Sequence, residues 1–200
     1  MKKFIALALA CAMTLSLVAC GGGSTTKETK AADSSSDAKE ILSVCLASEP
    51  DTLDPALNSA VDGATMVIHL FQGLASWQAT EDGGYTIVPA AATELVEPVA
   101  NEDGTVTYTY TLRDGLKWSD GEPVTAGDFE FAWKRAASVE LAADYNYMFE
   151  VVKGYADVWA ENPAEDAELA VKALDDKTLE VTLAAPVAYW NELLAFPTYM

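Results

Sequence analysis

Histidine and cysteine, which often serve as acid-base groups, nucleophiles and zinc ligands, are rare in this sequence. His69 is the single histidine among 200 residues, and the cysteines are Cys11, Cys20 and Cys45. His69 lies in an apolar run, which favours a helix residue over a metal ligand, and neither a second histidine nor a cysteine pair completes a zinc site. Gly-x-Ser-x-Gly, His-Glu-x-x-His and phosphate-loop motifs do not occur. The sequence therefore predicts a protein that is not an enzyme and holds no metal or cofactor.

Cys20 is the one side chain whose surroundings indicate a chemical modification. Two lysines precede an apolar stretch over residues 4–18, which is too short for a comfortable membrane span and is typical of a secretory signal. Ala19 directly before Cys20 resembles the end of a lipobox, in which the cysteine receives a diacylglycerol and becomes the first residue after cleavage. An ordinary signal with an incidental cysteine is the alternative. We expect a lipoprotein signal peptide over residues 1–19 and a lipid anchor on Cys20.

The residues that follow Cys20 have the composition of a linker. Residues 20–40 are rich in Gly, Ser, Asp and Ala and show no apolar periodicity. Such a sequence predicts a flexible tether between the anchored cysteine and a folded domain. Two acyl chains or more would hold the protein on the membrane for practical purposes.

Charge and composition exclude some classes of partner. The chain has 31 acidic and 12 basic residues, a formal net charge of −19. Nucleic acid and anionic lipid surfaces require basic patches, so we expect neither as a partner of this chain. An acidic surface is otherwise commonly solubilising. Half of the residues are hydrophobic, so the part after the tether can bury the core of one domain.

The elements that would position a site are clearest around residues 105–112. Tyr108, Tyr110 and Leu112 alternate with threonines, as a strand with one buried face requires. Two Asp-Gly turns follow, and Trp118 between them is expected to be a large apolar anchor.

A helix is expected to begin directly after these turns. Thr125 and Asp128 form a capping-box pattern, which indicates a helix from residue 126 to about residue 138. Helical spacing predicts that its buried face carries Phe129, Trp133 and Ala136.

The rest of the chain mixes strands and helices without a regular repeat. The expected strands cover residues 41–47 with Cys45 among them, 74–77 paired with 86–88, and 169–173 paired with 178–183. The expected helices cover residues 64–71 with Asp62 as N-cap, 147–159, and 189–194. The fold class that this mixture predicts is α+β, or mixed α/β.

Several short sequence motifs of this chain are similar to those of a known family. They read SEPDTLDP at 48–55, LFQGL at 70–74, LRDGLKWSDGEPVTAGDF at 112–129, WKRA at 133–136 and VKALDDKTLEVTL at 171–183. In this order they resemble the family 5 extracellular solute-binding proteins, which serve oligopeptide and dipeptide ABC transporters. The resemblance covers nearly everything from Ile41 to Met200.

The resemblance implies a fold and a domain organisation. It implies a two-lobed, periplasmic-binding-protein-like fold of type II, of which residues 41–200 would form the N-terminal part: a first-lobe strand, a small lobe and the return to the first lobe. In that family Met200 falls well under half way along the usual length, so we expect an N-terminal fragment or a truncated reading frame.

The resemblance also implies where a ligand would bind. The loop after the Leu-Asp-Pro motif, here Ser59, Ala60 and Val61, and a tyrosine after the WKRA helix, here Tyr145, occupy ligand-contacting places of the family. A plain surface loop and a packed aromatic are the alternatives. The family often has a glutamate at the Ser59 position, so a direct charge contact is not carried over. Glu49 is a weaker candidate, and most pocket residues would lie beyond Met200.

The function implied by the resemblance is peptide import. The protein would be a monomeric receptor, lipid-anchored at the outer face of the bacterial cell membrane, that closes on a short peptide and delivers it to an ABC permease with its ATPase. Three alternatives stay open. The same scaffold could carry a dipeptide, a nickel complex, haem or a pheromone, the protein could be a non-transport surface lipoprotein, or it could be a hydrolase.

Overall fold

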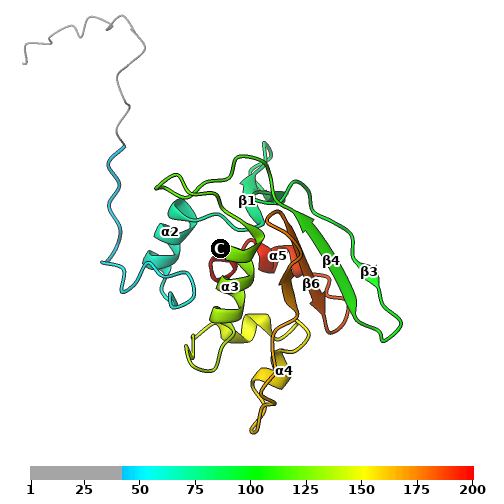
Figure 1. The fold of residues 1–200 in the computed structure, drawn as a ribbon. Coiled ribbons are helices and arrows are strands. Elements are labelled where there is room, and N and C mark those ends of the chain that lie inside the picture. The colour runs from blue at the N-terminus through cyan, green and yellow to red at the C-terminus, as the bar shows by residue number, and fades with distance from the viewer. Residues whose placement is uncertain (1–41) are drawn as a thin grey trace, which may run out of the picture. The chain divides into compact units, whose positions relative to one another are not determined.

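The computed structural model describes residues 42–200 of the chain (Figure 1). Its α-helices are α2 (Val61–Leu70), α3 (Ala126–Ala136), α4 (Tyr155–Val158) and α5 (Trp190–Leu194), and its 3-10 helices are η1 (Asn146–Phe149) and η2 (Pro197–Tyr199). Its strands are β1 (Ala75–Ala79), β2 (Tyr85–Pro89), β3 (Val99–Ala100), β4 (Val106–Thr111), β5 (Val171–Ala173) and β6 (Thr178–Leu183). This mixture confirms the predicted α+β class. None of the helices in this part of the chain is long and apolar enough to cross a membrane.

A four-stranded antiparallel sheet in the order β3-β4-β6-β5 forms the centre of the fold (Figure 1). Tyr108 lies opposite Val181 and Tyr110 opposite Leu179. All four side chains are buried, because side chains two apart on a strand share one face of the sheet. The predicted strand over residues 105–112 and the hairpin formed by 169–173 and 178–183 are therefore confirmed, as is the separate hairpin of β1 and β2.

Helix α3 packs against β5 and β6 and begins as the sequence predicts. The main-chain N–H of Thr125 donates to the carboxylate of Asp128 at 2.7 Å, which is half of the capping box. The three residues predicted for its inner face, Phe129, Trp133 and Ala136, are all buried.

The largest core side chains are aromatic and come from separate elements. The Trp133 ring lies 4.9 Å from Tyr199 and 6.2 Å from Trp190, both in edge-to-face geometry. Trp133 Nε1 donates to the Tyr199 carbonyl at 3.0 Å, and Trp190 Nε1 donates to the Tyr110 hydroxyl at 2.8 Å. Burial raises the pKa of Tyr199 and of Tyr110, so both hydroxyls stay protonated. The aromatic core thus ties α3 to the last residues of the chain.

The prediction of one helix over residues 147–159 is wrong, because two short helices, η1 and α4, take its place. Gly154 separates them with a φ of 90°, which a continuing right-handed helix cannot contain. A Cβ at this position would lie 2.0 Å from the carbonyl oxygen of Glu168. The close approach of a distant backbone segment therefore decides the break.

Two further local expectations are wrong. Trp118 is 43% exposed and is not the predicted apolar anchor, although the turns around it form with positive φ at Gly115 and Gly121. Asp62 is not the N-cap of α2, because the helix begins at Val61, three residues before the predicted start, and Ala60 takes the cap position. The Asp62 carboxylate instead accepts a hydrogen bond from the Ser48 hydroxyl.

The strand expected at the start of the ordered region does not form. Residues 42–47 have no strand geometry, and Cys45 is exposed. A strand needs a neighbour to satisfy its main-chain groups, and the alternation of apolar residues alone does not supply one. His69 lies in α2, as predicted, and its ring is exposed.

Candidate functional site

The loop that leads into α2 is fixed by an ion pair with α3. Arg135 donates from both terminal nitrogens to Asp54, at 3.0 Å to Oδ1 and 2.6 Å to Oδ2. Asp54 Oδ1 also accepts the Ala56 N–H, and the Asp54 carbonyl accepts the N–H groups of Leu57 and Asn58. A two-bond guanidinium–carboxylate contact fixes direction as well as distance. The sequence blocks contained both residues but gave no sign that they pair.

Asn58 continues this loop into the candidate ligand-contacting residues. Asn58 is buried, and its Oδ1 accepts the Ala60 N–H at 3.4 Å. Gly63 lies directly against it, since a Cβ on Gly63 would come within 1.9 Å of Asn58 Oδ1. Glycine is therefore needed here for the close approach of the loop to α2.

The candidate residues Ser59, Ala60 and Val61 lie at the end of this braced loop. Ser59 is exposed, Ala60 is half-buried, and Val61 is the first residue of α2 rather than a loop residue as predicted. The main-chain N–H and carbonyl of Ser59 make no hydrogen bond to any other residue in 42–200. These groups are free to pair with an extended ligand.

Tyr145 lies immediately before η1 and is half-buried. Its ring packs edge-to-face on Phe196 at 5.3 Å and lies 6.0 Å from Tyr147. Within residues 42–200, no hydrogen bond is formed by its hydroxyl. The ring is thus held by packing, whereas the polar end stays available as a donor or acceptor.

Both candidate regions border the same C-terminal segment. Helix α2 packs against η2, and Tyr145 packs on Phe196, the residue directly before η2. The segment itself is anchored in the aromatic core through Tyr199, whose hydroxyl donates to the Met148 carbonyl at 2.8 Å. The C-terminal segment therefore neighbours both candidate regions. Sequence reasoning missed Phe196, and the only signal that could have indicated it was the proline that directly follows it.

The weaker candidate, Glu49, is exposed. Within residues 42–200 no group of three or more histidine, cysteine, aspartate or glutamate side chains could hold a metal ion. Cys20 and the tether lie outside the described residues.

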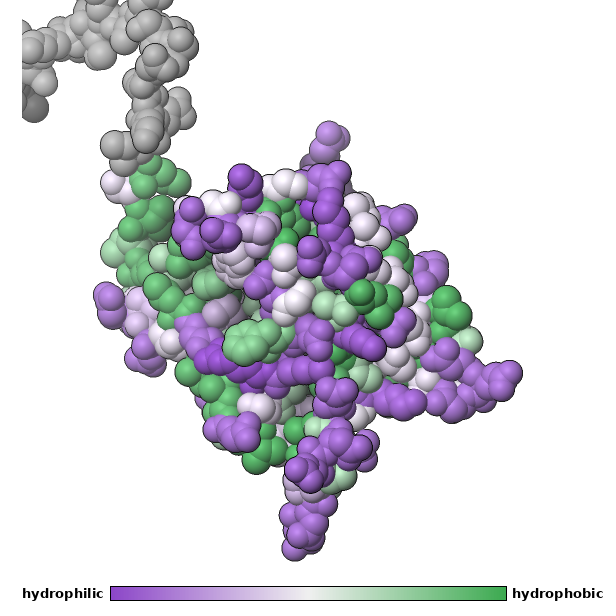
Figure 2. Space-filling model, in the orientation of Figure 1, coloured by the Kyte–Doolittle hydropathy of each residue, from purple (hydrophilic) through white to green (hydrophobic). Residues whose placement is uncertain are grey.

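Exposed apolar side chains gather around α2. In Figure 2 hydrophobic residues cover the surface over α2 and the segment before it, whereas hydrophilic residues dominate most of the remaining face. The exposed members in this region include Leu53, Leu57, Val61, Ile68 and Leu70. The neighbourhood of the Ser59 loop is therefore less polar than a typical surface of a protein with this net charge.

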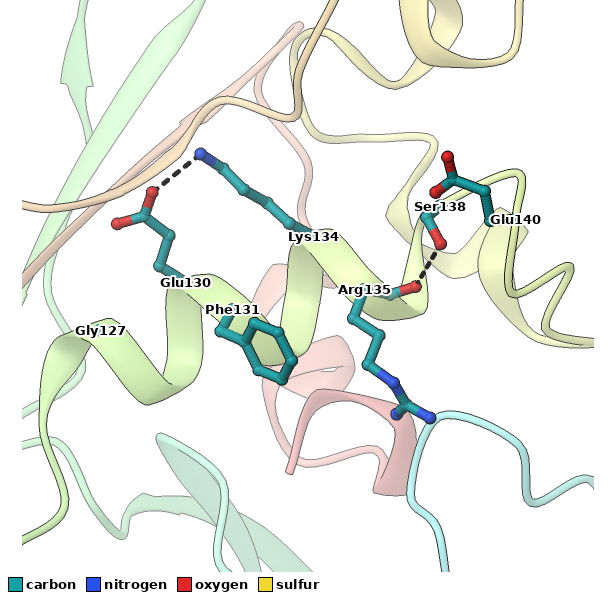
Figure 3. Close-up of a pocket in the computed structure, with 7 residues that line it drawn as sticks. All are labelled: Gly127, Glu130, Phe131, Lys134, Arg135, Ser138 and Glu140. Carbon is teal, nitrogen blue, oxygen red and sulfur yellow. Dashed lines mark hydrogen bonds and ion pairs between the residues drawn. The ribbon is translucent and has the colours of Figure 1, made fainter.

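A shallow cavity of about 510 Å³ lies on the outer face of α3 (Figure 3). Figure 3 shows Glu130 and Lys134 turned toward one another, and their charged atoms lie 2.8 Å apart. Arg135, which also lines the cavity, reaches away toward the Asp54 segment. Within this cavity Glu130 pairs with Lys134, whereas Arg135 pairs with Asp54 outside it, and the lining contains none of the predicted ligand-contacting residues.

The Asp54–Arg135 pair makes stability depend on pH. Hydrogen bonding from Arg135 is the main cause that lowers the pKa of Asp54 below its ordinary value. A depressed folded-state pKa stabilises the fold above the unfolded pKa, and this contribution is lost as the pH falls through the folded value. We expect Asp54→Asn to cost about 1 kcal/mol at pH 7, a modest figure because the pair is partly exposed, and much less at pH 2.

Urea unfolding followed by circular dichroism at both pH values measures this difference. Asp51→Asn is the matched control, because Asp51 is exposed and makes no hydrogen bond within residues 42–200. An equal cost of Asp54→Asn at pH 7 and pH 2 would contradict the assignment.

Comparisons with known proteins show what the chain is similar to. The model of the bacterial extracellular solute-binding proteins, family 5 (middle), matches residues 86–200. The oligopeptide-binding protein OppA of Bacillus subtilis is 38% identical over 200 residues, which is 100% of this chain and 35% of the relative. The probable deoxycholate-binding periplasmic protein YgiS of Escherichia coli is 40% identical over 152 residues, 76% of this chain and 27% of the relative.

A solved structure of Listeria monocytogenes OppA bound to peptide aligns with a TM-score of 0.61 at 40% identity, covering 73% of this chain and 27% of that one. The fold is thus that of part of an OppA-type binding protein, as predicted. The chain spans about a third of the length of the B. subtilis relative.

Proposed function

The chain belongs to the bacterial extracellular solute-binding proteins of family 5, and we propose from this membership that the protein binds short peptides. The observation that carries the proposal is the similarity, in both sequence and fold, to an OppA that was solved with a peptide bound. A receptor for varied peptides needs donors and acceptors that pair with the peptide backbone, because all peptides share that backbone.

Two features of this chain could provide such contacts. The unpaired main-chain groups of Ser59 can pair with the edge of an extended peptide. The N–H and carbonyl of Ala60 are already bonded to Asn58 and Ala64, so Ala60 and the 82% exposed Val61 would contact a peptide through their side chains. Tyr145 adds a hydroxyl on a ring that Phe196 holds in place. Main-chain groups and one hydroxyl discriminate little between peptide side chains, which suits a receptor of broad specificity.

The wider role in our proposal is peptide import. The receptor closes on its peptide, because a ligand that binds one conformation better shifts the population toward that conformation. An ABC permease with its ATPase then recognises the closed state. The protein acts as a monomer outside the cytoplasm, held at the bacterial cell membrane by a lipid on Cys20.

Isothermal titration calorimetry on the full-length protein tests peptide binding. We expect a stoichiometric heat signal with at least one member of the series from di-alanine to penta-alanine, and a melting temperature that rises with peptide concentration. Incubated peptide should remain intact by mass spectrometry, since cleavage would support a hydrolase. An absence of both heat and thermal shift across the series would contradict the proposal.

Bile acid is the second candidate cargo, because one relative at 40% identity is named as a probable deoxycholate-binding protein. Deoxycholate is an apolar, acidic molecule, and the exposed apolar side chains around α2 suit it better than they suit a peptide backbone. Deoxycholate below its micellar concentration therefore belongs in the same titration. Binding of deoxycholate without binding of any peptide would favour this second function, whereas nickel, haem and pheromone cargoes would each need their own titration.

Substitution of Cys20 tests the anchor. We expect Cys20→Ala to leave the protein without lipid, because the cysteine thiol is the acylation point, and to move it from the detergent phase to the aqueous phase in Triton X-114 partitioning. Cys45→Ala is the matched control, since Cys45 is exposed and not preceded by the lipobox-like residues. Unchanged partitioning of Cys20→Ala would show that the anchor lies elsewhere.

A further inference from the structure

The loop that presents Tyr145 is held at both ends by one short helix. The loop begins at Ala137, directly after α3, and leads to η1. Trp159 Nε1 donates to the Ala137 carbonyl at 2.7 Å, and the Tyr155 hydroxyl donates to Asn146 Oδ1 at 2.5 Å. Tyr155 and Trp159 are four residues apart in and directly after α4, so both project from the same side of that helix.

The two aromatic side chains also support each other. Their rings are stacked with centroids 6.0 Å apart and planes 27° apart, and the main-chain N–H of Trp159 donates to the Tyr155 carbonyl at 3.0 Å. Burial raises the pKa of Tyr155, which keeps its hydroxyl protonated as a donor at neutral pH. Moving either ring would disturb the hydrogen bonds at both ends of the loop.

Helix α4 is itself fixed to the rest of the fold independently of the loop. Gly154, directly before it, lies so close to Glu168 that no side chain fits between the two backbones. The neighbouring Lys153 donates its N–H to the Thr182 carbonyl at 2.9 Å, and its carbonyl accepts the Ala170 N–H at 2.8 Å. The helix can therefore act as a rigid support.

The loop between the two fixed ends contains a strained residue. Ala142 has a φ of 48°, in the left-handed region, and it is the one non-glycine residue in 42–200 with positive φ. Ala142 donates its N–H to the Ser138 carbonyl at 3.3 Å, and the Ser138 hydroxyl accepts the Leu141 N–H at 3.2 Å. A strained conformation persists only where surrounding contacts determine it, and such residues gather at ligand-binding sites.

We propose that Tyr155 and Trp159 are positioning residues for Tyr145, an inference that rests on the proposed peptide-binding function. By holding both ends of the loop, they keep the Tyr145 ring against Phe196 and its hydroxyl presented before any peptide arrives. A receptor group that is already ordered loses less conformational freedom on binding, so affinity depends on residues that never touch the ligand.

Hydrogen exchange of the full-length protein without ligand tests whether the support exists. Tyr155→Phe removes one hydroxyl and retains the ring. We expect the amides of residues 139–146 to exchange ~3- to 10-fold faster, the range that corresponds to loss of one hydrogen bond. Tyr85→Phe is the matched control, because Tyr85 is 73% exposed on β2, and it should leave the loop unchanged. Unaltered exchange of 139–146 in Tyr155→Phe overturns the inference whatever the ligand is.

A double-mutant cycle tests whether the support serves Tyr145. The probe is the member of the di- to penta-alanine series that the unmodified protein binds most tightly. We expect Tyr155→Phe to weaken its binding ~3- to 10-fold, and by less than about twofold when Tyr145→Phe is already present, because coupled residues are not additive. Trp159→Phe, which removes the indole N–H, should behave in the same way.

Equal losses with and without Tyr145→Phe overturn the positioning role. If the unmodified protein binds no member of the peptide series, the proposed function fails, and the exchange experiment alone decides whether Tyr155 and Trp159 fix the loop.

Discussion

Trp133→Ala is expected to destabilise the protein by about 4 kcal/mol, the usual cost of truncating a large buried aromatic side chain. Trp133 is fully buried and contacts the rings of Phe149, Trp190 and Tyr199. Its removal leaves a cavity between these rings and also leaves the Tyr199 carbonyl without the indole donor. The midpoint of urea unfolding, followed by far-ultraviolet circular dichroism, measures the loss.

Trp118→Ala is the matched control for this substitution. Trp118 is 43% exposed, so the same change of side chain should cost less than about 1 kcal/mol. Trp133→Phe separates packing from hydrogen bonding, because it keeps an aromatic ring and removes only the N–H together with part of the volume. A Trp133→Ala variant no less stable than Trp118→Ala would show that the aromatic core does not hold the fold.

Tyr145→Ala is expected to weaken binding of the tightest alanine peptide by ~10- to 100-fold while the protein stays folded. The hydroxyl offers a hydrogen bond and the ring offers apolar contact, and together such contacts contribute about 1.5–3 kcal/mol. Tyr145 is half-buried, and outside this loop its main ring contact is Phe196, so stability should fall by much less than for Trp133→Ala. Calorimetric titration gives the affinity, and thermal unfolding gives the stability.

The neighbour Tyr147 provides the control for this binding experiment. Its ring is 50% exposed and lies 6.0 Å from the Tyr145 ring, so Tyr147→Ala removes the same kind of side chain from the same short segment. We expect it to change affinity less than threefold. Unchanged affinity in Tyr145→Ala, or an equal loss in both variants, would remove Tyr145 from the binding site.

The local sequence pattern was sufficient to predict those elements whose signals lie within a few neighbouring residues. The alternation of Tyr108, Tyr110 and Leu112 predicted β4, because side chains of a strand point to opposite faces in turn. The Thr125 and Asp128 pair predicted the start of α3, because a capping box is formed by residues only three apart. The same blocks of sequence also indicated the family, which the match over residues 86–200 confirms.

The expectations that failed depended on residues distant in the sequence. The helical pattern over residues 147–159 contained nothing to indicate that the Glu168 backbone would approach Gly154. The apolar character of Trp118 did not reveal that the fold offers no cavity to receive it. A sequence pattern records the preferences of a segment, whereas burial depends on which surfaces the rest of the chain brings to it.

For the candidate site too, the sequence indicated some features and the tertiary structure decided others. The sequence by itself determined the family resemblance, and this resemblance implies Ser59, Ala60, Val61 and Tyr145 as candidates because they occupy ligand-contacting places of the family. Only the tertiary structure decided how they are held: the loop before α2 by the ion pair of Asp54 with Arg135, 81 residues away, and Tyr145 by packing on Phe196, next to Asn146, which accepts a hydrogen bond from Tyr155 of α4. These contacts join segments whose separation along the chain has no periodic signal, and they exist only once the core has brought those segments together.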